Sequence, residues 1–182
     1  MATLSNIEKK LQEKLQAALA TLPTVVVNEA VNWTKQNFRR QGWPGQSFQA
    51  WKPRAANAKR NAGRGLLIDS GRLSRSIRVI SVGQLQATFG TDVPYAAAHN
   101  NGFTGTVNVS QHKRNKIGTI KVSTGKSGQP FKNKKAITGT GIVKAHQRRM
   151  KLPRRRFIGN SPVLVSILKR KSIVHIAREL KK

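Results

Sequence analysis

The sequence of 182 residues contains no cysteine and only six acidic residues. Without cysteine the chain cannot form a disulfide scaffold or the common structural zinc sites. Six acids also leave few carboxylates for general acid–base pairs or for hydrolytic metal sites. The four histidines are spread along the chain without an HxxH or HExxH spacing, and no phosphate-binding GxxxxGK[ST] motif occurs. We therefore expect no enzyme, no metal site and no cofactor.

Two of the acids, Asp69 and Asp92, stand alone in this basic chain. A catalytic carboxylate is one interpretation of such a residue. A helix cap, or an ion pair with Arg72 or Arg75, explains both acids more simply. His99 follows Tyr95 at a spacing of four, and we expect it to have a packing or hydrogen-bonding role rather than a metal-binding one.

Long apolar runs are also absent. The longest uncharged stretch near the N-terminus, 15–28, is too short for a membrane-spanning helix and contains Pro23. The first residues carry Glu8 and Glu13 in an amphipathic pattern, without the apolar centre of a secretory signal. We expect neither a membrane segment nor a secretory signal.

Positive charge is abundant, because 35 lysines and arginines give a formal net charge of +29. About half of this excess lies between residues 100 and 157. Such an excess opposes compaction by self-repulsion and favours polyanionic or acidic partners, although a merely solubilising surface is the simpler alternative. The candidate partner contacts are the clustered cations Lys113, Arg114, Lys116, Lys132, Lys134, Lys135, Arg148, Arg149, Lys151, Arg154, Arg155 and Arg156.

The last three candidates, Arg154, Arg155 and Arg156, are consecutive. Strand alternation would turn one of them away from the other two. We therefore expect one of the three to be structural, bound to a carboxylate or a carbonyl group.

Hydrophobic spacing predicts helices at both ends of the chain. Residues 4–22 carry an apolar stripe at three- and four-residue spacing, Pro23 is expected to end or kink this helix, and a second helix follows over 24–40. Ser161 and Pro162 are a typical N-cap and N1 pair for a C-terminal helix through about residue 181.

Shorter elements are expected in between. Residues 46–66 look irregular, and Asp69 or Ser70 can cap a short helix that begins near Gly71. Strands over 77–82 and 85–90 suggest a hairpin, and 94–101 suits a short helix ended by Gly102. The expected fold class is α+β, with the N- and C-terminal helices packed on a small antiparallel sheet in a single domain over 1–182.

Residues 103–147 differ in composition, since glycine, threonine, serine and lysine are frequent there. Short β-prone runs predict a long basic hairpin-like arm, inserted within the domain and ending in a mobile, basic tip. At about 3.3 Å per residue its reach is at most on the order of 60–70 Å. A disordered insertion is the alternative.

Three blocks of sequence resemble, in order, motifs of the phage virion morphogenesis family, the Mu-like tail-completion and neck proteins. The first is the Trp51-Lys52-Pro53 turn with the following LLIDSGRLSRSI. The second is VPYAAAHNNGF, and the third is MKLPRRRFIGNSP. The sequence departs from the family pattern in the long basic insertion and at Arg155, where the family often has a small residue.

The resemblance implies a non-catalytic virion protein that acts at the head–tail junction as a homo-oligomeric ring of about six copies. The implied partners are head connector or portal-side proteins, tail-tube or tail-terminator proteins, and genomic DNA in the channel. The implied location is the neck or tail of a virion assembled in the host cytoplasm. The alternative from another class is a basic nucleic-acid-binding protein of the ribosomal or nucleoid kind.

Overall fold

The chain consists of two compact units in the computed structural model, which describes residues 4–54, 63–122 and 132–182. The first unit, which we call the body, comprises Met1–Phe103 and Leu152–Lys182, and the second, which we call the arm, comprises Thr104–Lys151. Parts of two sequence-based expectations lie outside the described residues: the middle of the 46–66 stretch and the tip of the 103–147 insertion. The body holds the helices and the hydrophobic core, and the arm consists of strands.

A single helix, α1 (Leu4–Arg40), replaces the two N-terminal helices expected from the sequence. Pro23 lies inside it and neither ends it nor separates two helices, so that expectation was wrong. Proline removes one helical hydrogen bond, but packing can offset this loss when the residue is buried. Pro23 is buried, and the face predicted for the second helix, which includes Val27, Val31 and Phe38, is buried as well.

The end of α1 is followed at once by a short hairpin. Strands β1 (Gly42–Pro44) and β2 (Phe48–Ala50) pair in antiparallel fashion, and β2 lies inside the 46–66 stretch that we expected to be irregular. A strand of three residues is too short for its alternation of apolar and polar side chains to be recognised in a sequence. Gln41, at φ 56°, provides the left-handed residue that turns the chain out of the helix, a place more often taken by glycine.

The expected hairpin in the middle of the chain is confirmed as β3 (Arg78–Val82) and β4 (Ala87–Gly90), which are antiparallel. It lies between two short helices, α2 (Arg72–Ser76) and α3 (Ala96–Asn101). Gly71 occupies the N-cap position of α2 without a side-chain cap, so the expected side-chain cap was wrong there, although Ser70 Oγ accepts a bond from the Arg72 amide. Gly102 ends α3 at φ 80°, as expected.

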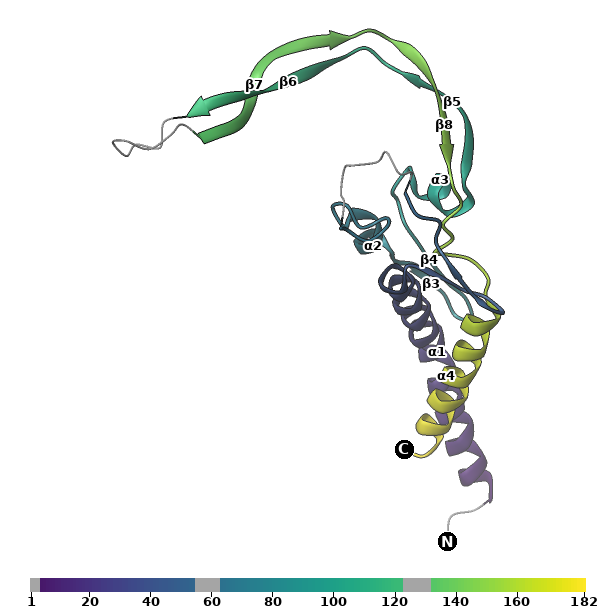
Figure 1. Cartoon of the computed structure of the whole chain (residues 1–182). Helices are drawn as coiled ribbons and strands as arrows, with labels where there is room; N and C mark the ends of the chain where they lie inside the picture. Colours follow the sequence, from purple (N-terminus) through teal and green to yellow (C-terminus); the bar gives the residue numbers. More distant parts are fainter. Residues whose placement is uncertain (1–3, 55–62, 123–131) are drawn as a thin grey trace. The chain divides into compact units, whose positions relative to one another are not determined.

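The C-terminal helix α4 (Pro162–Leu180) is confirmed together with its Ser161 cap. It runs antiparallel along α1, because Lys171 in the middle of α4 pairs with Glu29, while Lys14 Nζ, earlier in α1, donates to the Leu180 carbonyl at the end of α4. Figure 1 shows that α1 continues beyond the last turn of α4.

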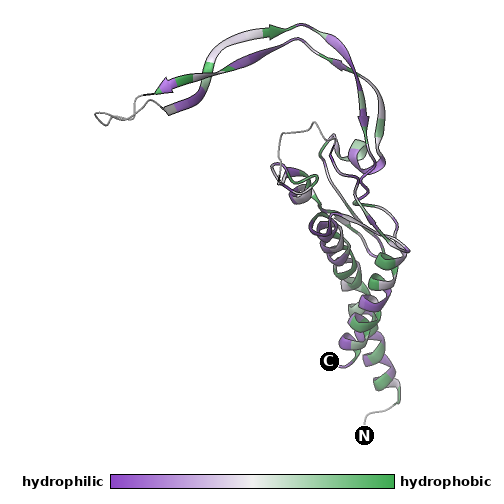
Figure 2. Cartoon of the chain, viewed as in Figure 1, coloured by the Kyte–Doolittle hydropathy of each residue, from purple (hydrophilic) through white to green (hydrophobic). Residues whose placement is uncertain are grey.

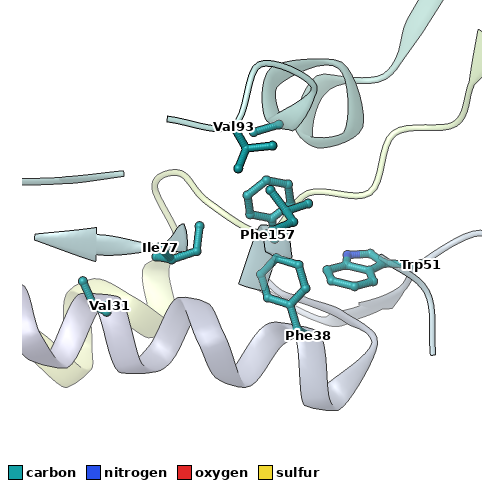
Figure 3. Packing of buried hydrophobic residues seen from close by; sticks show 8 residues of the cluster. Val31, Phe38, Trp51, Ile77, Val93 and Phe157 are labelled. Carbon is teal, nitrogen blue, oxygen red and sulfur yellow. The ribbon is translucent and has the colours of Figure 1, made fainter. Parts of the chain in front are cut away.

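The main hydrophobic core of the body gathers side chains from α1, α2, α3 and the segments between the helices (Figure 3). Phe157, which is fully buried, packs against Phe38 with ring centroids 5.1 Å apart, and Trp51 stands edge-on to Phe38 at 5.5 Å. Leu73, Ile77 and Val93 complete the cluster from α2, its C-cap and the loop before α3. A second cluster joins Trp33 of α1, Trp43 of β1 and Leu164 of α4.

The arm contains strands β5 (Phe103–Val109), β6 (His112–Val122), β7 (Lys132–Val143) and β8 (His146–Leu152). Strand β6 pairs with β7 in antiparallel register, and β5 pairs with β8. The strands thus form a two-stranded ribbon (Figure 1), along which hydrophobic and hydrophilic residues are mixed (Figure 2).

The fold class is α+β, as the sequence indicated. The described strands form four separate two-stranded pairs and not the one sheet that we expected. Along the chain, α2 separates the β1–β2 pair from the β3–β4 pair, and α3 separates the latter from the four strands of the arm.

Candidate functional site

The three sequence blocks that resemble the phage family meet in the body, around the backbone of residues 155–158. Trp51 Nε1 donates to the Arg156 carbonyl at 2.8 Å. From the second block, Asn100 Oδ1 accepts from the amides of Phe157 and Ile158, each at 3.0 Å. Side chains of one block thus form hydrogen bonds with backbone groups of another. These motifs therefore form a structural junction and not a set of reactive side chains.

Helix α1 contributes a fourth part to this junction that the sequence analysis missed. Asn37, which is fully buried, donates from Nδ2 to the Phe157 carbonyl at 3.1 Å. Gln41 bonds both the amide and the carbonyl of Leu66 through its side chain. A buried amide on an otherwise apolar helix face is the signal that could have identified Asn37, because buried polar groups need partners.

The consecutive arginines have three different environments. Arg155 is 7% exposed, and its Nε and Nη2 atoms donate to the carbonyls of Lys52 and Pro53 at 2.9 and 3.1 Å. Arg156 lies 4.2 Å from the ring centroid of Trp43 and donates to the Asn160 carbonyl. Arg154 is exposed. The expectation that one of the three is structural is confirmed for Arg155, whose Nε and Nη2 atoms bind two carbonyl groups of the body. These carbonyls are neutral, and no acid forms an ion pair with Arg155 among the described residues.

A pocket of about 420 Å³ opens beside Arg155 in the body. Arg54, Arg72 and Arg155 line it together with one acid, Asp69. The rest of its lining is mainly apolar or hydroxylated, from Leu66, Leu67, Ser70, Gly71, Leu73, Tyr95 and His99. Three guanidinium groups and one carboxylate give the lining a positive charge.

His99 lies in this pocket with its ring edge-on to Tyr95 at 5.9 Å, in the packing role that the sequence indicated. Its Nδ1 atom is buried and has no hydrogen-bond partner among the described residues. Burial, and then the charge of Arg155, lower the pKa of His99 below 6.5. Burial followed by the charge of Arg54 also lowers the pKa of Arg155, so the buried charges here repel one another.

The two lone acids form ion pairs, though not with the expected partners. Asp69 lies 3.6 Å from Arg64, and Asp92 lies 3.3 Å from Arg78. Both pairs are largely exposed, and exposed ion pairs contribute little stability. No group of three histidine or acidic side chains that could hold a metal ion occurs within 4–54, 63–122 and 132–182.

The arm carries nine of the candidate contact residues: Lys113, Arg114 and Lys116 on β6; Lys132, Lys134 and Lys135 on β7; Arg148, Arg149 and Lys151 on β8. The register pairs Lys134 with Ile120 and Lys135 with Thr119, which are neighbours on β6. Neighbours along a strand point to opposite faces. The structure therefore distributes these cations over both faces of the ribbon and does not gather them on one.

The arm also lacks a counter-charge of its own. Residues 104–151 contain twelve lysines and arginines and no acid. Large apolar side chains stand among the cations, with Ile117 69% exposed and its cross-strand partner Ile137 63% exposed. An isolated two-stranded hairpin is marginally stable at best in water, so a ribbon of this composition gains most from a partner surface.

Comparisons with known proteins identify the family of the chain. No described helix is long and apolar enough to cross a membrane. No curated protein and no solved structure matches the chain. The family model for the phage virion morphogenesis family matches residues 2–165, which include all three of the sequence blocks that meet around Phe157. By this match over most of its length, the chain belongs to the phage virion morphogenesis family.

Proposed function

We propose that the chain is a structural component of the neck or tail end of a tailed phage, where it acts without catalysis in head–tail joining as a homo-oligomeric ring. The family places the chain in phage virion morphogenesis. The proposal adds that copies close into a ring of about six, the kind of symmetric assembly that buries repeated contacts. Such a ring would bring together well over a hundred positive charges.

The observation that carries the proposal is the charge of the arm. Its cations lie on both faces of a ribbon that has no acid, and no described residue of the arm is buried. A partner must therefore supply negative charge to both faces, which a groove or a channel does better than a flat surface. Genomic DNA passing through a ring, and acidic surfaces of portal-side or tail proteins, both meet this requirement.

We expect substitution of the arm cations to affect joining and not folding. The test variant replaces Lys132, Lys134, Lys135, Arg148 and Arg149 by Gln in the virus. Particles should then lose DNA or remain as unjoined heads and tails, while the purified variant keeps the helical content of the wild type. A control of equal charge removes five cations from the helices of the body: Lys35, Arg39, Lys169, Arg170 and Arg178. Equal yields of filled, joined particles for wild type and arm variant would refute the proposed role of the arm.

A nucleic-acid-binding protein of the ribosomal or nucleoid kind is the second candidate, favoured by the charge alone. It predicts tight DNA or RNA binding by the isolated chain, with an affinity that falls steeply as salt is added. The ring proposal predicts weak binding by the isolated chain and strong binding to a connector or tail ring. A titration of both partners at two salt concentrations separates the two functions.

A further inference from the structure

The pocket beside Arg155 has an excess of positive charge that the described chain does not neutralise. Arg155 has no ion pair in the described ranges, although it is almost fully buried. Arg72 also lines the pocket and forms no side-chain hydrogen bond or ion pair within the same ranges. Asp69 supplies one negative charge against three arginines. The adjacent stretch 55–62, AANAKRNA, contains no acid.

Buried or half-buried cations are stabilised by an anion, and the shape of the pocket favours one carried on an apolar stem. Leu66 and Leu67 are half-buried at the pocket and Leu73 is buried beneath it. A phosphate on a nucleic-acid backbone would leave these leucines without a contact. A carboxylate on a side chain flanked by apolar residues would satisfy both the arginines and the leucines.

The same chain exposes such a carboxylate at the other end of the body. Helix α1 extends beyond α4 (Figure 1), and its end carries Leu4, Ile7 and Leu11, each more than half exposed. Glu8 lies one turn after Leu4 and three residues before Leu11, which places the three on one side of the helix. The Glu8 side chain has no hydrogen bond or ion pair in the described part of the chain.

The charge of the chain points to a second copy as the occupant of the pocket. Residues 4–22 carry a net charge of only +1 in a chain of +29, so two copies repel each other little at this helix end. Four of the six acids, Glu29, Asp69, Asp92 and Glu179, already form ion pairs. Glu8 and Glu13 remain, and only Glu8 borders the exposed apolar stripe, since Glu13 lies on the opposite side of the helix.

We propose that the pocket of one copy receives the exposed end of α1 from the next copy, with Glu8 of that copy paired to Arg72 and facing Arg155. The two surfaces are different patches of the chain, so the contact is heterologous and repeats head to tail, as closure of a ring requires. The inference rests on the proposed homo-oligomeric function and names the self-association surface for it.

Charge reversal in the full-length chain tests the contact. We expect Glu8→Arg and Arg72→Glu each to weaken self-association about tenfold or more in Kd, measured by sedimentation velocity over a concentration series. Glu13→Arg is the matched control, because it makes the same change on the other side of the same helix turns, and it should leave Kd within about twofold of wild type. Circular dichroism and thermal unfolding identify a variant that is misfolded.

The decisive measurement is an equimolar mixture of the two weakened variants. In the mixture the helix end of the Glu8→Arg variant, now basic, can enter the pocket of the Arg72→Glu variant, now more acidic. The unaltered helix end of the second variant can enter the unaltered pocket of the first, so alternating copies associate again. Restoration of wild-type Kd supports the contact even if either variant alone is less stable.

Four outcomes overturn the inference. The first is a wild-type chain that remains monomeric throughout the series, and the second is a mixture that stays as weak as its components. The third is an Arg72→Glu variant that loses DNA binding but self-associates normally, because the anion of the pocket would then be a phosphate. The fourth is self-association whose Kd is unchanged by Glu8→Arg, Arg72→Glu and Glu13→Arg. This result rejects the proposed surface but not the ring, whose function the arm variants in virus test separately.

Discussion

Ser161 joins the C-terminal helix to the hairpin that follows α1, and its replacement by alanine is the sharpest test of how the body is held together. The residue is fully buried. Its Oγ atom accepts from the Leu164 amide at 3.5 Å and donates to the Pro44 carbonyl at 2.5 Å. One hydroxyl therefore caps α4 and satisfies a buried carbonyl of β1.

The expected loss follows from these two contacts. Loss of a serine N-cap costs about 1 kcal/mol, and a buried carbonyl left without its donor costs about 1–3 kcal/mol. We expect Ser161→Ala to lower the free energy of unfolding by about 2–4 kcal/mol. For a chain of this size each kcal/mol lowers Tm by about 2–4 °C.

Urea unfolding followed by far-ultraviolet circular dichroism measures this loss. The matched control is Ser172→Ala, in the same helix, because the Ser172 hydroxyl only adds a second bond to the Leu168 carbonyl. The control should change stability by less than about 0.5 kcal/mol. If Ser161→Ala and Ser172→Ala have the same stability, Ser161 does not connect α4 to β1 and the reasoning is refuted.

Two further predictions concern the core and the pocket. Phe157→Ala should lower the free energy of unfolding by about 3–5 kcal/mol, because the ring is fully buried against Phe38. Phe157→Leu should lower it less, as measured by unfolding in denaturant. Equal losses for the two variants would contradict this prediction and show that the site collapses around the cavity. The lowered pKa of His99 means that the unfolded chain takes up a proton below about pH 6.5 that the folded chain resists. Stability should therefore fall as the pH drops from about 6.5 through the folded pKa, and His99→Gln should reduce this fall, whereas parallel pH profiles for the two proteins would contradict it.

Much of the fold was predictable because its strongest signals are local. The cap and proline at Ser161–Pro162 and the glycine after α3 predicted helix ends that the structure confirms. Pro23 misled the prediction, because the energetic cost of a proline depends on its surroundings as well as on its own chemistry. A proline that is buried on a long helix packed against α4 and β4 can remain inside that helix.

The candidate site was predictable in composition and not in arrangement. Clustering of lysine and arginine identified the arm strands, but the division of these cations between two faces follows from the pairing of β6 with β7. The sequence also indicated that one of Arg154, Arg155 and Arg156 is structural. It could not tell which one, because the Lys52 and Pro53 carbonyls that bind Arg155 lie more than a hundred residues away.

Composition and order of residues by themselves determined that this chain is strongly basic, has few groups for catalysis, and carries the three motifs of a virion morphogenesis protein. These properties depend on which residues are present and on their neighbours along the chain. Only the tertiary structure decided that the motifs converge on Phe157, that a positively charged pocket opens beside Arg155, and that the end of α1 stays uncovered. Each of these depends on contacts between distant segments, whose free energy is fixed by burial and by hydrogen bonding in the folded chain.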